Sequence, residues 1–171
     1  MTYAAAQPSN LSKKQVATIA EEFARGFGYH PGGDLHEFIG KIGGKVTVED
    51  TLLRDPEHSG SLFVESSDNF KIVLPAHTGL ARDRFTLAHE LGHYVLHYLW
   101  DPAQNGRMMA LRRGSDRIEW EANWFAAAFL MPSQQFTERY HAVGGDLGRL
   151  ATEFGVSSSA AEVRARGLGL I

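Results

Sequence analysis

The spacing of apolar residues predicts several amphipathic helices. The longest candidates span residues 11–27, about 80–100 and about 116–131, because apolar side chains recur there every three or four positions with polar residues between them. Shorter helices are expected over 35–42, 133–141, 147–154 and from about 159 to 166, each closed by a glycine. The last two resemble a helix-turn-helix unit.

Three segments instead have the composition of short strands. Lys45–Glu49, Ser61–Glu65 and Phe70–Leu74 are rich in Val, Ile and Phe and are separated by polar turns. We expect them to form a small three-stranded antiparallel sheet in which the last two make a hairpin. Residues 101–115 contain Pro, Gly, Gln, Asn and three arginines, which predicts a long loop bordering a cleft. The expected fold class is α+β and mainly helical.

Composition narrows the setting and the chemistry. The chain has 171 residues, of which 43% are hydrophobic, which suits one main domain (11–141) with a small helical appendage (142–171) packed on it. A net charge of -3 gives no overall reason to expect nucleic acid as a partner. The first ten residues lack signal-peptide features and no apolar run could span a bilayer, so a cytoplasmic protein is expected. Without cysteine, a metal would be bound by His, carboxylate and water.

The sequence His89-Glu90-Leu91-Gly92-His93 carries the most specific chemical signal. Positions i and i+4 share one face of a helix, so both imidazoles can bind the same ion. Glu90 is displaced around the helix, where it can act on a water beside the ion as a general base without being a ligand. This pattern is typical of a zinc-peptidase site.

A catalytic zinc needs a third protein ligand. A metzincin would supply a third His from the same segment, but the corresponding positions are Leu96 and Leu99, which excludes that class. A gluzincin-like site takes a Glu from a later helix instead. Glu121 lies about 60° from the apolar stripe of the helix at 116–131, whereas Glu119 points away from that stripe. Glu121 is therefore the predicted third ligand.

Other polar groups near the motif have more open roles. His97 continues the face of His89 and His93, and we interpret it as a residue supporting the ligands, since a fourth protein ligand would close the site. His97, Tyr94, Tyr98 and the arginines of residues 107–117 are candidate donors to the transition state, with no basis for choosing among them. Arginines in the tail are interleaved with acidic residues, so packing or partner docking is favoured over DNA binding.

Two longer segments resemble the ImmA/IrrE family of metallopeptidases. They are Arg84-Phe85-Thr86-Leu87-Ala88-His89-Glu90-Leu91-Gly92-His93-Tyr94-Val95-Leu96-His97 and Glu121-Ala122-Asn123-Trp124-Phe125-Ala126-Ala127-Ala128-Phe129-Leu130-Met131-Pro132. The tail from Phe154 to Leu170 is similar to the segment that closes the peptidase region of that family. Three separated motifs thus agree in order and spacing.

The resemblance implies a zinc-dependent endopeptidase with His89, His93 and Glu121 as ligands and Glu90 as base. Zn²⁺ is the expected cofactor, with Mn²⁺ as a second possibility. Members of this family cleave a DNA-binding repressor, so the expected partner is a helix-turn-helix repressor that serves as substrate. The alternative is a noncatalytic, metal-containing module that regulates a repressor or a toxin–antitoxin partner.

Overall fold

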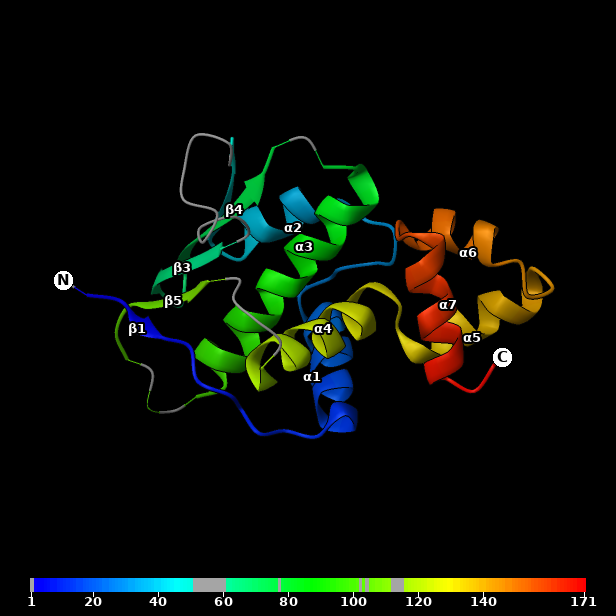
Figure 1. The fold of residues 1–171 in the computed structure, drawn as a ribbon, viewed down its shortest axis with the longest axis horizontal. Helices are drawn as coiled ribbons and strands as arrows, with labels where there is room; N and C mark the ends of the chain where they lie inside the picture. The colour runs from blue at the N-terminus through cyan, green and yellow to red at the C-terminus, as the bar shows by residue number, and fades with distance from the viewer. Residues whose placement is uncertain (1, 51–60, 77, 102, 104, 112–115) are drawn as a thin grey trace.

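A computed structural model describes residues 2–50, 61–76, 78–101, 103, 105–111 and 116–171. Its helices are α1 (Lys13–Gly26), α2 (Leu35–Lys41), α3 (Leu80–His93), α4 (Arg117–Leu130), α5 (Ser133–Ala142), α6 (Leu147–Phe154) and α7 (Ser158–Gly167). Figure 1 shows the sheet at one end, α3 and α4 in the middle and α5–α7 at the other end. Mixed α+β architecture with mainly helical content is therefore confirmed.

Five of the seven described helices begin at a residue whose side chain caps the first turn, whereas α3 and α5 begin at Gly79 and Pro132 without such a cap. Asp34, Asp116, Asp146 and Ser157 each accept a hydrogen bond from the backbone N–H three residues later, which satisfies one of the free donors of a first turn. Ser12 forms a complete capping box with Gln15 at the start of α1. The helices predicted over 35–42, about 116–131, 147–154 and about 159–166 therefore begin within a residue or two of their starts in the structure.

The predicted three-stranded antiparallel sheet is wrong. The described strands are β1 (Ala4–Ala5), β2 (Gly44–Glu49), β3 (Ser61–Ser66), β4 (Asn69–Pro75) and β5 (Met108–Leu111). They form one five-stranded sheet in the order β1-β5-β3-β4-β2. The β3–β4 hairpin is antiparallel as expected, but β2 pairs with β4 in parallel and β1 pairs with β5 in parallel. A mixed sheet results.

Two of these strands escaped prediction for a physical reason. β5 lies within the segment predicted as a loop and is only four residues long. It pairs with β3 on one side and with β1 on the other. β1 has two alanines, which have little strand propensity. Both strands exist because a neighbouring strand offers its edge, which a local pattern does not report. The remainder of the predicted loop lies partly outside the described residues.

Helix α3 is the central element. It packs against α4 on one side and against β3 and β4 on the other, and its residues from Thr86 to His93 are all buried. After His93 the helix continues as the π-helical segment η2 (Tyr94–Leu99), a departure from α-helical geometry that is frequent at functional sites. The motif helix is thus held on both faces.

Gly92 allows α3 and α4 to approach closely. A Cβ atom at this position would lie 3.0 Å from the Phe125 Cβ and 3.1 Å from both the Cα and the carbonyl oxygen of Ala122. Normal carbon–carbon contacts lie at about 3.5–4.0 Å. The glycine in the motif therefore lets the two helices pack more closely than an alanine there would allow.

The C-terminal helices are fixed to this core by charged side chains as well as apolar packing. The Arg84 guanidinium donates to the carbonyls of Gly155 (3.0 Å) and Gly33 (2.7 Å) and to the Tyr29 hydroxyl (2.8 Å). Phe154 and Phe136 meet in the same apolar cluster as the residues of α3 and α4.

The division of the chain into two parts at residue 142 stays a prediction. Across the part of the chain described, no helix combines the length and apolarity needed to cross a bilayer.

Candidate metal centre

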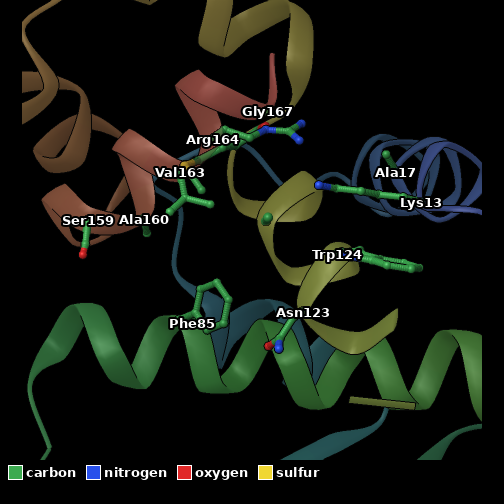
Figure 2. Close-up of a pocket in the computed structure, with 12 residues that line it drawn as sticks. Lys13, Ala17, Phe85, Asn123, Trp124, Ser159, Ala160, Val163, Arg164 and Gly167 are labelled. Carbon is green, nitrogen blue, oxygen red and sulfur yellow. The ribbon is translucent and has the colours of Figure 1, made fainter. Parts of the chain in front are cut away.

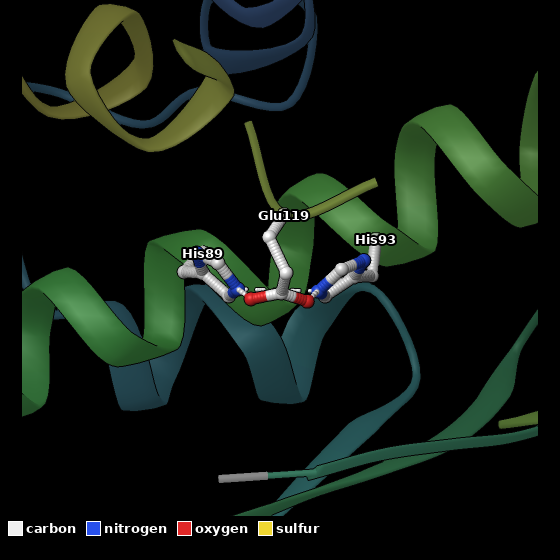
Figure 3. A group of neighbouring side chains, drawn as sticks. All are labelled: His89, His93 and Glu119. Carbon is white, nitrogen blue, oxygen red and sulfur yellow. Dashed lines mark hydrogen bonds and ion pairs between the residues drawn. The ribbon is translucent and has the colours of Figure 1, made fainter. Parts of the chain in front are cut away.

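Three buried side chains from two helices meet at one point. His89 and His93, one turn apart on α3, direct their Nε2 atoms toward each other at 3.1 Å. The Glu119 carboxylate from α4 bridges them, with Oε2 3.1 Å from His89 Nε2 and Oε1 3.1 Å from His93 Nε2. Figure 3 shows this carboxylate between the two rings. Their ligand atoms all lie within 4.8 Å of one another.

The geometry fits a small divalent ion. In a tetrahedral zinc site with bonds of about 2.0–2.1 Å, neighbouring ligand atoms are about 3.4 Å apart. The 3.1 Å separations observed here are close to that value. Two imidazole nitrogens and a carboxylate form a donor set that zinc favours, and three protein ligands leave a position for water or substrate. The cluster can therefore hold a metal ion.

Hydrogen bonds on the far side of each ring favour the ligating tautomer. His89 Nδ1 lies 2.9 Å from Asn123 Oδ1, an acceptor, so this nitrogen carries the proton and donates it. His93 Nδ1 lies 3.0 Å from His97 Nδ1. When both Nδ1 atoms hold their protons, both Nε2 lone pairs face the Glu119 carboxylate. Partners of this kind fix ring orientation in metal sites.

Burial sets the charge state of these groups. Loss of solvent lowers the pKa of His93 to about 4, against the opposing effect of the Glu119 carboxylate, so the ring is neutral at neutral pH. Burial tends to raise the pKa of Glu119, but its contacts with His89 and His93 outweigh burial and lower the pKa to about 2. Neutral imidazoles and an ionised carboxylate are the forms that bind metal.

Glu90 follows His89 on α3 and is equally buried, with 1% of its surface exposed. Its position on the motif helix is the one expected of the general base. Asn123 and Glu119, four residues apart, share one face of α4, and both contact His89.

Glu121 is not placed as predicted. Its Oε2 atom accepts from His97 Nε2 at 2.8 Å and its Oε1 atom from Arg117 Nε at 2.9 Å. It therefore contacts His97 while Glu119 contacts the two motif histidines, and Glu119 replaces Glu121 as the candidate third ligand. The apolar stripe of α4 packs against α1 as well as α3. The side of α4 that carries this stripe is therefore not the side that faces the two motif histidines. The i, i+4 pair of Glu119 and Asn123 was the available signal.

The remaining predicted residues divide into two groups. His97 lies beside His93, in agreement with a supporting position. Tyr94 donates to the Ser67 carbonyl in the β3–β4 turn and stacks on Phe70, and Tyr98 stacks on Tyr94. The structure thus directs the Tyr94 hydroxyl at the sheet, and a role for either tyrosine in the transition state stays a prediction.

A cavity of about 380 Å³ opens onto the cluster. Its lining residues are Ala5, Ala6, His93, Met109, Ala110, Leu111, Asp116, Ile118 and Glu119. Strands β1 and β5 form one wall and the start of α4 the other. A largely apolar cavity therefore opens beside two of the candidate ligands.

A second cavity, of about 420 Å³, lies farther along α4, between that helix, α1 and α7. Figure 2 shows Asn123 and Phe85 at its base and Val163 of α7 at its wall. It is lined mainly by apolar groups and includes neither motif histidine. The cleft beside Glu119 is therefore the candidate active site.

Comparisons with known proteins agree with this picture. Residues 46–166 match the model of the IrrE N-terminal-like domain, Peptidase_M78. A structure titled Mycobacterium tuberculosis transcriptional regulator superposes with a TM-score of 0.58 at 19% identity, over 90% of this chain and 46% of that one. The chain thus spans about half the length of that regulator, and at this identity the likeness shows the fold alone. No curated protein matches the sequence. The family model covers well over half of the chain, which belongs to the IrrE N-terminal-like domain family of peptidases.

Proposed function

We propose that this protein is a zinc-dependent endopeptidase that cleaves a DNA-binding repressor at a specific site. The observation that carries the proposal is the buried cluster of His89, His93 and Glu119 at the end of a peptide-sized cleft, with Glu90 one residue from the first ligand. Membership of the family supports a peptidase, and the similar structure is that of a protein described as a transcriptional regulator.

The residues divide the chemistry among them. His89, His93 and Glu119 would hold the zinc ion, which when bound polarises a peptide carbonyl and makes a water molecule more acidic. Glu90 takes a proton from the attacking water and then gives it to the leaving amine nitrogen. The cleft formed by β1, β5 and the start of α4 binds the peptide and excludes bulk water. Manganese is the alternative ion to test.

The test is co-expression with a helix-turn-helix repressor from the same genome, followed by intact-mass spectrometry. Wild-type protein should give two fragments whose masses define one cleaved bond, and Glu90→Gln should bind zinc but leave the repressor intact. Glu22→Gln is the matched control, because Glu22 is exposed on α1. Cleavage by Glu90→Gln at the wild-type rate would refute the proposed base.

Metal content distinguishes the remaining outcomes. Glu119→Gln should lose tightly bound zinc, measured by elemental analysis after gel filtration. If wild-type protein is fully loaded with zinc and every repressor tested stays intact while remaining bound to it, the noncatalytic regulatory module becomes the better description.

A further inference from the structure

The carboxylate of Glu121 is completely buried and accepts five hydrogen bonds. Oε2 accepts from Ser9 N (2.9 Å), Ser9 Oγ (2.8 Å) and His97 Nε2 (2.8 Å). Oε1 accepts from Asn10 N (2.9 Å) and Arg117 Nε (2.9 Å). A buried carboxylate is costly unless its lone pairs are satisfied in this way. Its position and charge are therefore tightly fixed.

His97 connects this carboxylate to the candidate metal centre. Its Nε2 atom donates to Glu121, which leaves Nδ1 as an acceptor for the Nδ1 proton of His93 at 3.0 Å. Every ring in this path is buried. The order of donation runs from His93 to His97 to Glu121, and it leaves the Nε2 lone pair of His93 facing Glu119.

We propose that Ser9 and Asn10, through Glu121 and His97, orient His93 for metal binding. The inference rests on the proposed metal centre and extends it to the N-terminal segment, which is about 80 residues from the motif in sequence. Ser9, Asn10, Glu121 and His97 are positioning residues, since their contact with the ion passes through His93. In many metal sites the ligating histidine donates directly to a carboxylate. Here the imidazole of His97 lies between His93 and the Glu121 carboxylate, so the hydrogen-bonded chain has one more member.

The local backbone supports a defined role for the N-terminal turn. Asn10 has a φ of 59°, and among the described residues it is the one non-glycine with a positive φ. Asparagine tolerates this left-handed conformation better than most residues. The turn brings two consecutive backbone N–H groups onto the two oxygens of one carboxylate. Arg117 also donates to the Leu11 carbonyl and so ties the same turn to α4.

The segment geometry explains how His97 reaches its neighbours. His97 lies in the π-helical segment η2, four residues after His93. Residues at i and i+4 share one face of a helix, and the two rings have centroids 5.1 Å apart. The departure from α-helical geometry and the relay therefore coincide.

The experiment measures metal affinity directly, with zinc and cobalt as the probes and the full chain as the protein. Competition with a chromophoric chelator gives the zinc Kd, and the visible absorption of the cobalt form reports the ligand geometry. His97→Phe should weaken zinc binding by about 10–100-fold, the usual effect of removing a group that orients a metal-ligating histidine. His97→Gln, whose amide can both accept from His93 and donate to Glu121, should lie closer to wild type.

A pair of serine substitutions separates positioning from folding. Ser9→Ala removes one donor to Glu121, whereas Ser12→Ala removes the N-cap of α1 and touches no member of the relay. Ser9→Ala should weaken zinc binding and alter the cobalt spectrum. Ser12→Ala should lower the Tm of the metal-free protein and leave both metal readouts unchanged.

The outcomes are distinct. If wild-type protein binds neither zinc nor cobalt, the proposed function fails. If wild type binds zinc but Ser9→Ala, and any His97→Phe that folds, have its Kd and its cobalt spectrum, the relay is refuted. Equal losses of affinity in Ser9→Ala and Ser12→Ala would also refute it, because they would trace the effect to stability.

Discussion

Replacing Gly92 by Ala should weaken metal binding more than it weakens folding. The added methyl group would lie 3.0–3.1 Å from Phe125 and Ala122, so α3 and α4 must separate by about 0.5 Å to restore normal contacts. Ala stabilises a helix by about 1 kcal/mol relative to Gly, and overpacking costs about 1–3 kcal/mol. The free energy of unfolding should therefore fall by only about 0–2 kcal/mol.

Metal binding is less tolerant of this shift. His93 and Glu119 lie on opposite sides of the α3–α4 interface, and ligand distances in a metal site vary by only about 0.2 Å. We expect the zinc Kd to rise by about tenfold or more, an effect comparable to loss of an orienting partner. Urea unfolding of the metal-free protein measures the first quantity and chelator competition the second.

Gly40→Ala provides the control for this experiment. Gly40 lies in α2, and a Cβ there would meet nothing within 4 Å. That variant should gain up to about 1 kcal/mol and keep the wild-type zinc Kd. If Gly92→Ala behaves in the same way, the claim that this glycine sets the distance between the helices is refuted.

Three further predictions concern the scaffold. Burial raises the pKa of Tyr29, against the opposing effect of Arg84, so its stabilising contribution is complete below about pH 10 and is lost as the pH rises above it; Tyr29→Phe should flatten this alkaline loss in denaturation curves. Arg84→Lys should lower the free energy of unfolding by about 2–4 kcal/mol, because one ammonium cannot reproduce the three hydrogen bonds; an unchanged urea midpoint would contradict this. Removing zinc with EDTA should lower the Tm, since an ion at a thousandfold excess over its Kd stabilises the folded state by about 4 kcal/mol; a Tm that does not depend on zinc would argue against a specific site.

The elements that the sequence predicted well are those whose signal is local. The periodic helices and the β3–β4 hairpin have their apolar pattern, caps and turns within a few residues of each other. The two histidines of the motif likewise share one helical face by spacing alone. These features do not depend on how distant segments pack.

The choice of third ligand depends on packing, and the structure brings Glu119 rather than Glu121 to the two motif histidines. Choosing between Glu119 and Glu121 requires the rotation of α4 relative to α3, and α4 buries residues against two helices at once. The apolar stripe of such a helix has no single direction. Glu119 and Asn123, at i and i+4, place two polar groups on one helical face, and this spacing was the better indicator of the face turned toward His89.

The N-terminal contribution left no pattern at all. Ser9 and Asn10 precede α1 in a segment without periodicity, and their role depends on a backbone turn that meets a carboxylate more than 100 residues later. The same holds for β1, whose two alanines pair with β5. Contacts of such sequence separation follow from the folded topology and cannot be inferred from local spacing.

The position of β1 has a practical consequence for handling the protein. Ala5 and Ala6 line the cleft beside Glu119, so a polyhistidine tag placed before this strand would bring additional imidazoles close to the metal ligands. Such a tag could compete for the ion or occupy the cleft during purification. The C-terminus lies at the opposite end of the molecule (Figure 1), where Ile171 is 51% exposed. Affinity tags and fluorescent fusions therefore belong after residue 171.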